Sequence, residues 1–275
     1  MNKEINNSSK CPICGRPTHK ESKYCIFHAS AEEKSEEEFK KELKEYINKI
    51  KKKGINFDFK KFIFVGNIGF KDYFNERISR RVDFDGSIFE GDADFYGIKF
   101  GWNASFAEVT FKKIVNFSRA FFKQYADFYD ATFNDEVIFG GTIFRHQSDF
   151  SEATFNGVSN FSEAIFFEEA NFRETTFNED IFFNLNEFIS NLFFYQCKLC
   201  SGKKLFIEKA RGLSGRKIIF EHSYLENVNL IIDSYNDILI DFNNAFLRNT
   251  KIQREQIENH ILQERVKKFK EAKEI

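Results

Sequence analysis

Phenylalanine recurs at every fifth or sixth position between Phe84 and Phe194. Two series alternate, and each follows an 11-residue repeat whose step is divided into 5 and 6. A repeat of this regularity decides the architecture before any other pattern, because each copy must form the same structural unit. The sequence therefore predicts a solenoid. The two series are Phe84, Phe95, Phe106, Phe117, Phe128, Phe139, Phe150, Phe161, Phe172, Phe183 and Phe194, and Phe89, Phe100, Phe111, Phe122, Phe133, Phe144, Phe155, Phe166, Phe177 and Phe188.

An α-helix is the first alternative, because helices also tolerate an 11-residue repeat. A step of five residues, however, turns by about 140° around a helix at roughly 100° per residue. The two Phe series would then lie on nearly opposite faces. Asn, Asp, Gly and Thr also crowd the positions between the Phe residues, and these are poor helix formers. The repeat is therefore expected to be extended.

The residue two positions before each Phe indicates how the extended chain is oriented. It is usually small or aliphatic, as at Val82, Ala93 and Ala126. Positions i and i−2 lie on the same side of a strand, so each unit should place one small and one large side chain inward. The residue between them is often Asp, Asn or Thr and should point outward.

These units resemble the pentapeptide-repeat family, whose consensus is A-(D/N)-(L/F)-x-x. The matching runs are ADFYG at 93–97, ADFYD at 126–130 and ANFRE at 170–174. The resemblance extends from about Val82 to Phe194 and implies a right-handed, four-sided parallel β-helix with Phe as the central inward residue. This chain departs from the family pattern because every second unit has six residues.

The division into 5 and 6 indicates a four-sided, 22-residue coil, with a bulge-like extra residue on two sides. The alternative is a two-sided, 11-residue coil, which would crowd two Phe rings and two smaller side chains into one thin layer. A 22-residue coil predicts four vertical Phe stacks with rings about 4.8 Å apart, the spacing of strands in a sheet. Each coil would contact only its neighbours, so both ends of the solenoid need caps.

A cysteine-containing segment near the amino terminus has the spacing of a metal site. Two residues separate Cys11 from Cys14, and the same spacing separates Cys25 from His28 after a loop of ten residues. Tetrahedral zinc takes four nitrogen or sulfur ligands that tight turns bring together. We therefore predict a structural Zn²⁺ site of these four residues, with His19 as an alternative fourth ligand. A disulfide or free thiols are the other interpretation, and an intracellular setting disfavours the disulfide.

The remaining segments complete the predicted organisation of the chain. A capping box at Ser35 begins an amphipathic helix that ends at Gly54, and such zinc heads with a following helix resemble the front of other pentapeptide-repeat proteins. The predicted division is a zinc knuckle at 1–32, an amphipathic helix or linker at 33–54, an irregular amino-terminal cap at 55–81, the repeat β-helix at 82–195, irregular and closing coils at 196–252, and a carboxy-terminal helix at 253–275.

Charge is segregated along the chain although its formal sum is only −1. Residues 1–81 carry a net charge of +7, residues 82–195 carry −12 and residues 196–275 carry +4. The start of the chain is polar, and no run reaches the roughly 20 apolar residues of a membrane span. A soluble, cytoplasmic protein is expected. Cys197 and Cys200 form a second pair, interpreted as cap residues rather than as half of a metal site or a redox couple.

The sequence contains no nucleophile elbow, phosphate-binding glycine loop or zinc-protease motif, so an enzyme is not expected. The favoured function is a scaffold that binds a protein partner through the sides of the solenoid or the terminal helices. The resemblance implies an alternative, because some members of the family mimic duplex DNA and occupy a topoisomerase, and the acidic middle fits this role. A third hypothesis is nucleic-acid binding by the basic residues around the knuckle, where phosphate contacts would make binding salt-sensitive: Lys10, Arg16, Lys20 and Lys23.

Overall fold

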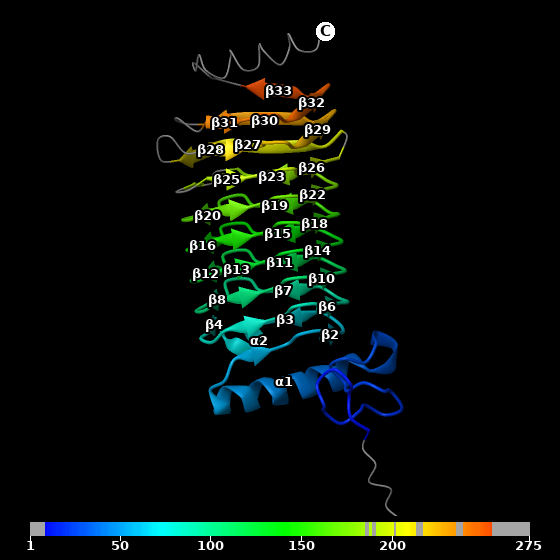
Figure 1. The fold of residues 1–275 in the computed structure, drawn as a ribbon. Coiled ribbons are helices and arrows are strands. Elements are labelled where there is room, and N and C mark those ends of the chain that lie inside the picture. Colours follow the sequence, from blue (N-terminus) through cyan, green and yellow to red (C-terminus); the bar gives the residue numbers. More distant parts are fainter. Residues whose placement is uncertain are drawn as a thin grey trace, which may run out of the picture.

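The chain folds into a column of stacked coils, with a helix lying across one end (Figure 1). The computed structural model describes residues 9–184, 187–188, 191–200, 202–212, 217–234 and 239–254. Successive strands lie on different sides of the column, and each pairs in parallel with the strand one coil away. This arrangement confirms the predicted four-sided parallel β-helix.

Sides one and two, numbered in chain order, are nine-stranded sheets. Side one contains β1 (Phe57–Asp58), β5 (Val82–Asp83), β9 (Ala104–Ser105), β13 (Ala126–Asp127), β17 (Ser148–Asp149), β21 (Ala170–Asn171), β25 (Leu192–Phe193), β28 (Lys217–Ile219) and β31 (Leu239–Asp241). Side two contains β2 (Ile63–Phe64), β6 (Ile88–Phe89), β10 (Thr110–Phe111), β14 (Thr132–Phe133), β18 (Thr154–Phe155), β22 (Thr176–Phe177), β26 (Lys198–Leu199), β29 (Tyr224–Glu226) and β32 (Phe246–Arg248).

Sides three and four are joined near the carboxy-terminal end of the column, because the long strand β27 pairs with strands of both sides. Side three contains β3 (Ile68–Gly69), β7 (Ala93–Asp94), β11 (Val115–Asn116), β15 (Val137–Ile138), β19 (Ser159–Asn160), β23 (Ile181–Phe182), β27 (Lys204–Gly212), β30 (Asn229–Ser234) and β33 (Lys251–Arg254). Side four contains β4 (Arg77–Ile78), β8 (Lys99–Phe100), β12 (Phe121–Phe122), β16 (Ile143–Phe144), β20 (Ile165–Phe166) and β24 (Glu187–Phe188).

The register of the strands gives the length of the coil. Val115 pairs with Val137, and the same 22-residue offset relates the strands of all four sides through the middle of the column. The two-sided, 11-residue coil is therefore excluded. In the first coil the offset is 25 on side one, where Phe57 pairs with Val82. The additional residues lie between β3 and β4 and include the short helix α2 (Lys71–Phe74).

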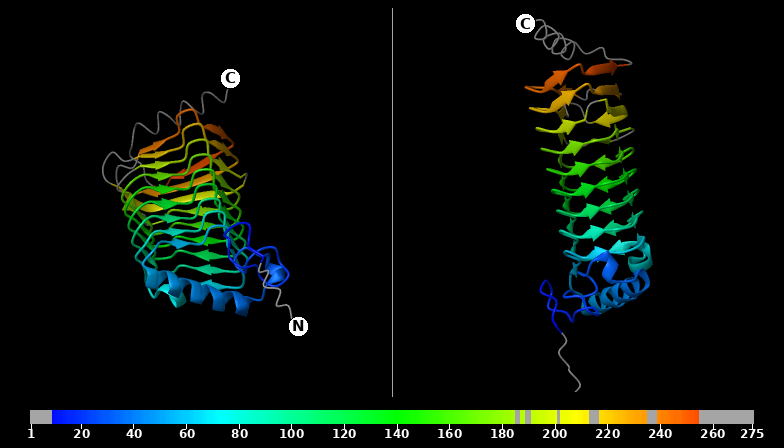
Figure 2. Two further views of the ribbon diagram at one scale, coloured as in Figure 1. Left: turned by 60° about the horizontal axis from the view of Figure 1, so that its bottom comes forward. Right: turned by 90° about the vertical axis from the view of Figure 1, so that its right-hand side faces the viewer.

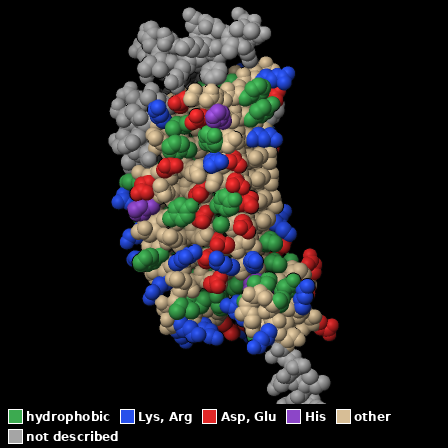
Figure 3. Space-filling model, viewed as in Figure 1, with side chains coloured by type: hydrophobic (Ala, Val, Ile, Leu, Met, Phe, Trp, Pro, Cys, Tyr) green, Lys and Arg blue, Asp and Glu red, His purple; other side chains and the backbone are tan. Residues whose placement is uncertain are grey.

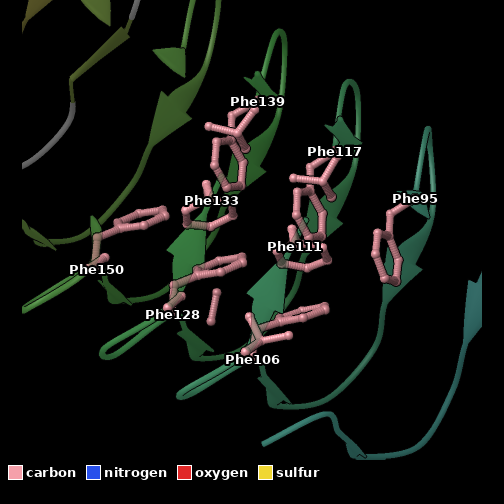
Figure 4. Packing of buried hydrophobic residues seen from close by; sticks show 14 of the residues in the cluster. Phe95, Phe106, Phe111, Phe117, Phe128, Phe133, Phe139 and Phe150 are labelled. Carbon is pink, nitrogen blue, oxygen red and sulfur yellow. The ribbon is translucent and has the colours of Figure 1, made fainter. Parts of the chain in front are cut away.

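The Phe ladder forms the interior, as predicted (Figure 4). Along side one, the ring of Phe128 stacks on Phe106 and Phe150 with centroids 5.0 and 4.9 Å away and planes within 5° of parallel. Around the coil the rings meet edge to face, as for Phe128 and Phe139 at 85°. Both geometries are favourable for aromatic pairs, and each buried ring contributes roughly 150–250 Å² of apolar surface.

The two unit lengths correspond to two kinds of corner. Five-residue units turn through a residue in the left-handed conformation two positions after Phe, such as Gly141 (φ 65°) or Glu152 (φ 60°). The Asp or Asn before Phe stabilises this turn, because its side chain accepts the N–H two residues on, as between Asp127 and Tyr129 at 3.1 Å. Six-residue units between Phe89 and Phe177 turn without a left-handed residue. On side two the outward residue of these units is Thr in four successive coils, from β10 to β22.

Helix α1 (Glu36–Lys53) covers the first coil, as Figure 2 shows from below. Ser35 caps it by accepting the N–H of Glu38, and Gly54 ends it in the left-handed conformation, both as predicted. Its apolar face packs on the coil rather than remaining open for a partner, and Tyr46 donates a hydrogen bond to the carbonyl oxygen of Asp58. The buried residues of this face are Phe39, Leu43, Ile47 and Ile50.

The segment expected as an irregular cap at 55–81 already forms a coil with a strand on each side. The insertion that carries α2 interrupts the 11-residue phase, which is why the sequence pattern does not reveal this coil. At the other end, most of the predicted helix at 253–275 lies outside the described residues, while its first two positions belong to β33. No helix among the described residues has the length and hydrophobicity needed to cross a bilayer.

Candidate metal centre

Two turns bring the predicted ligands together. In the first, the N–H of Gly15 donates to the carbonyl oxygen of Cys11 at 2.8 Å, and Gly15 has a φ of 70° that favours glycine. Lys10 and Pro17 form an antiparallel bridge that closes this turn. In the second, the N–H groups of His28 and Ala29 donate to the carbonyl oxygen of Cys25. Each turn thus directs two ligand side chains to the same point.

The four ligand atoms lie within 4.8 Å of one another. Cys14 Sγ is 3.5 Å from Cys25 Sγ, and His28 Nδ1 is 3.3 Å from Cys25 Sγ and 3.5 Å from Cys11 Sγ. A tetrahedral zinc ion with Zn–S of about 2.3 Å and Zn–N of about 2.0 Å separates its ligand atoms by about 3.5–3.8 Å. The cluster therefore has the dimensions of a closed four-ligand site that could hold a metal.

The second nitrogen of His28 also behaves as it would in a metal site. Nε2 lies 3.0 Å from the carbonyl oxygen of Lys60 in the first coil, which can only accept a hydrogen bond. Nε2 must therefore carry the proton, so Nδ1 presents its lone pair to the cysteines. Such a backbone partner fixes the orientation of a ligating imidazole. His19 does not join the cluster: its Nε2 lies 3.9 Å from Glu38 on α1.

Ionisation of the thiols is uneven without a cation. Burial raises the pKa of Cys25 to about 12, and the hydrogen bond with Cys14 adds to the rise. Burial also opposes ionisation of Cys11, but backbone N–H groups and the contact with His28 lower its pKa to about 6. Adjacent thiolates repel each other unless a cation lies between them, and a divalent metal favours the deprotonated form of each ligand. The donor set therefore fits a metal such as zinc.

The metal-site segment adds a layer beneath side two, in the column of Phe62 rather than in that of the Phe stack, which begins at Phe64. Phe27 accepts the N–H of Ile63 on its carbonyl oxygen at 2.8 Å, as a strand one coil below would do. Its ring stacks on Phe62 with centroids 4.5 Å apart and planes 7° from parallel. Lys34 strengthens this junction by donating to the carbonyl oxygens of Ile26 and Ile63 at 2.8 and 2.6 Å. Nothing in the residue pattern indicated this direct continuation of the column.

Arg16 fixes the other side of the knuckle. Its guanidinium carbon lies 4.6 Å from the ring centroid of Tyr46 on α1 and 5.2 Å from that of Phe27. Lys20, also adjacent to the knuckle, donates to Glu38 at 2.8 Å. Lys23 lies over the ring of Tyr24, with Nζ 5.0 Å from the centroid. Three of the four cations that were candidates for phosphate contacts therefore make contacts within the protein.

The second cysteine pair is divided between interior and exterior. Cys197 is buried, and its Sγ lies 3.2 Å from the hydroxyl oxygen of Ser223. Cys200 donates to the side-chain oxygen of Asn178 on the outside of side two. Among the described residues, the only cluster of His, Cys, Asp and Glu that could hold a metal is the amino-terminal one.

The comparison with known families agrees with the repeat. Residues 95–143 and 139–184 match the family described as pentapeptide repeats (9 copies). The central coils of this chain are therefore pentapeptide repeats. The match covers the central coils of the pentapeptide-repeat column, where the 22-residue offset is uninterrupted. Neither the curated proteins nor the solved structures gave a match to the chain.

Proposed function

We propose that this pentapeptide-repeat protein is a non-enzymatic scaffold that binds a protein partner through the sides of its solenoid or its terminal helices. The observation that supports this proposal most is that different residues of each coil form the core and the outer surface. The Phe residues and the small residues two positions before them form the core, whereas the residues between them face outward, where the Asp and Asn of the five-residue units also stabilise the turns. Repeat proteins use such extended surfaces for recognition.

The metal site has a structural role in this proposal, with zinc as the metal. Four protein ligands would fill a tetrahedral coordination shell, which is typical of structural rather than catalytic zinc. The knuckle and α1 together cover the apolar end of the first coil. Without this cover, Phe59, Phe62 and Phe64 would lose their neighbours on one side.

The scaffold proposal is tested by crosslinking in the native host. A partner should be recovered with the wild-type chain, and its yield should fall when outward residues of one side are replaced. The comparison set is four variants, each with two exposed charges reversed on a single side. Recovery that is unchanged in all four variants would remove the solenoid surface from the proposal.

Mimicry of DNA is the second candidate, and the acidic corner between sides one and two favours it. The left-handed corner positions of four successive coils are all acidic and exposed. A column of carboxylates at the coil spacing resembles a line of phosphates in charge. A supercoiling assay with DNA gyrase tests this candidate, and full supercoiling activity at micromolar protein would rule it out. The four residues are Glu108, Asp130, Glu152 and Glu174.

Nucleic-acid binding by the zinc head remains the least favoured candidate, because Arg16 and Lys20 make internal contacts. A salt-dependent gel shift with the full chain would support it. The matched variants are Lys10→Glu plus Lys23→Glu in the head and Lys99→Glu plus Lys113→Glu in the solenoid. Only the first pair should weaken binding if the head is responsible.

A further inference from the structure

Side four differs from the other sides in its outward residues. Side two presents Thr at the outward position of four successive coils, whereas side four presents Phe121, Ile143 and Ile165 at the outward position of three. These three side chains are only partly buried. Trp102, on the corner that leads from β8 of side four to β9 of side one, is 60% exposed, the most exposed large apolar side chain of the described residues. Side four and this corner therefore combine an apolar column with an exposed indole.

Cations lie on the amino-terminal side of this apolar column and along one edge of it, although the repeat region as a whole is acidic. Arg77, Arg80, Lys99 and Lys123 are exposed on side four or at its corner, and Arg145 lies over the ring of Phe167 at 4.2 Å. Of these five, only Lys99 has a carboxylate within ion-pair distance among the described residues, that of Glu76 at 3.4 Å. Figure 3 shows Lys and Arg side chains along its left-hand edge, where side four turns away from the viewer.

The backbone hydrogen-bonding groups of side four are already paired within the protein. Between β4 and β24 each strand pairs with the strands one coil above and below, so no free strand edge faces outward there. A partner cannot add a strand to this side and must be recognised through side chains. Of the common ways of binding a peptide, a helix laid against an apolar strip satisfies this condition.

The spacing of the coils also suits a helix that runs along the column. The inner rings of side four, Phe100, Phe122, Phe144 and Phe166, are separated by 4.6, 5.1 and 4.9 Å. An α-helix advances about 5.4 Å per turn. Successive turns of such a helix would therefore meet successive coils over the three-residue apolar column, with one apolar side chain for each coil.

We propose that side four, from Arg77 to Arg145, is the docking surface for an acidic amphipathic helix of a protein partner. Leu-like residues of the partner would cover Trp102, Phe121 and Ile143. Its Glu and Asp residues would pair with the flanking cations, which, apart from Lys99, have no carboxylate partner among the described residues. This inference rests on the proposed scaffold function and assigns it one side and one partner chemistry.

Trp102 is the only Trp of the chain, so its fluorescence reports on this surface alone. The probe is a synthetic 18-residue peptide with Leu at i, i+3, i+4 and i+7 spacing, Glu elsewhere and no aromatic residue. We expect its titration into the full chain to shift Trp102 emission to shorter wavelength, with saturation. The same peptide with Lys in place of Glu should cause no shift.

Variants test the surface directly. Lys123→Glu plus Arg145→Glu should weaken binding of the Glu peptide by at least about tenfold, because charge complementarity becomes repulsion. The matched control, Lys113→Glu plus Lys198→Glu on and beside side two, should bind as the wild type does. Far-ultraviolet circular dichroism and thermal melting of both variants verify that the column remains folded.

The inference would be overturned if the Glu peptide caused no shift of Trp102 emission, or if the Glu and Lys peptides caused equal shifts. It would also be overturned if oligo(dT) shifted the emission and the Glu peptide did not, or if the emission shifted with protein concentration in the absence of any peptide. The last two would indicate single-stranded nucleic acid and a second copy of the chain as the occupant. If the Glu peptide fails while substitutions on another side abolish host crosslinking, the scaffold function stands and side four is not its docking surface.

Discussion

The knuckle at residues 9–34 and the column at 57–254 differ in the side-chain contacts that hold them together. The knuckle converges on one cluster of four side chains, each supplied by a turn. The column distributes its contacts over many equivalent Phe rings, each stacked on its counterparts in the coils above and below. Loss of one ligand should therefore affect the whole knuckle, whereas loss of one ring should affect a coil and its neighbours.

The largest effect is expected from removal of the metal site. Cys11→Ser plus Cys14→Ser should abolish bound zinc, because two of the four ligands are lost. The knuckle should then lose its fold, because zinc binding contributes on the order of 10 kcal/mol to the folding of such units. Amide hydrogen exchange should lose protection over residues 9–34 while the central coils stay protected. Chelator treatment of the wild type should have the same effect.

The control for this experiment is Cys200→Ser, which changes a thiol on the outside of side two. It should leave zinc at one equivalent per chain, measured by elemental analysis. If wild-type protein contains no zinc, or if the double variant retains it, the assignment of the metal site is wrong.

The second effect concerns one ring of the column. Phe128→Ala should lower the free energy of unfolding by about 3–5 kcal/mol, since it leaves a cavity between two stacked rings. Tyr129→Ala, at the next position but exposed, should cost less than about 0.5 kcal/mol. Denaturant unfolding measures both values. Equal costs for the two variants would contradict the packing of the ladder.

A smaller effect should come from the left-handed corners. Glu152 has a φ of 60°, where a side chain is strained, and Gly occupies the equivalent corner at Gly86, Gly97 and Gly141. Glu152→Gly should stabilise the column by roughly 0.5–1 kcal/mol after the entropic cost of glycine is subtracted. Glu152→Ala retains the strain and should not stabilise. Thermal melts of the two variants separate relief of strain from loss of charge.

The smallest effect is expected at Asp127. Burial, with the nearby Asp149, raises the pKa of its carboxyl group, so the folded state disfavours the charged form. Asp127→Asn should therefore stabilise the column at neutral pH, by less than about 1 kcal/mol. Asn can keep the turn, as Asn171 does at the same position of a later coil.

The pH dependence provides the check. Because the folded pKa is raised, the penalty of Asp127 is present at neutral pH and disappears as the pH falls through the folded pKa towards the ordinary value of 3.8. The stability difference between variant and wild type should shrink over the same range. A difference that is constant with pH would point to a cause other than charge. Asp130→Asn, at an exposed corner, is the control.

The sequence predicted the features that depend on local periodicity. The Phe spacing gave the 22-residue coil, and the spacing of Cys11, Cys14, Cys25 and His28 gave the cluster that the structure forms. The same pattern could not reveal the coil at 57–78, because the insertion containing α2 shifts its phase. Nor could it reveal that Phe27 stacks on Phe62, since this contact joins residues 35 positions apart and depends on how the knuckle docks.

The constant register of the central coils has a consequence for the history of the chain. A segment such as 106–127 begins and ends at equivalent points of adjacent coils. Duplication of such a segment within the gene would insert a complete layer whose upper and lower contacts resemble those already present. The column would lengthen by about 4.8 Å per layer, the distance between paired strands. Its length is thus a property that can change in whole steps while the metal site and α1 at one end and the strands β31–β33 at the other are unchanged.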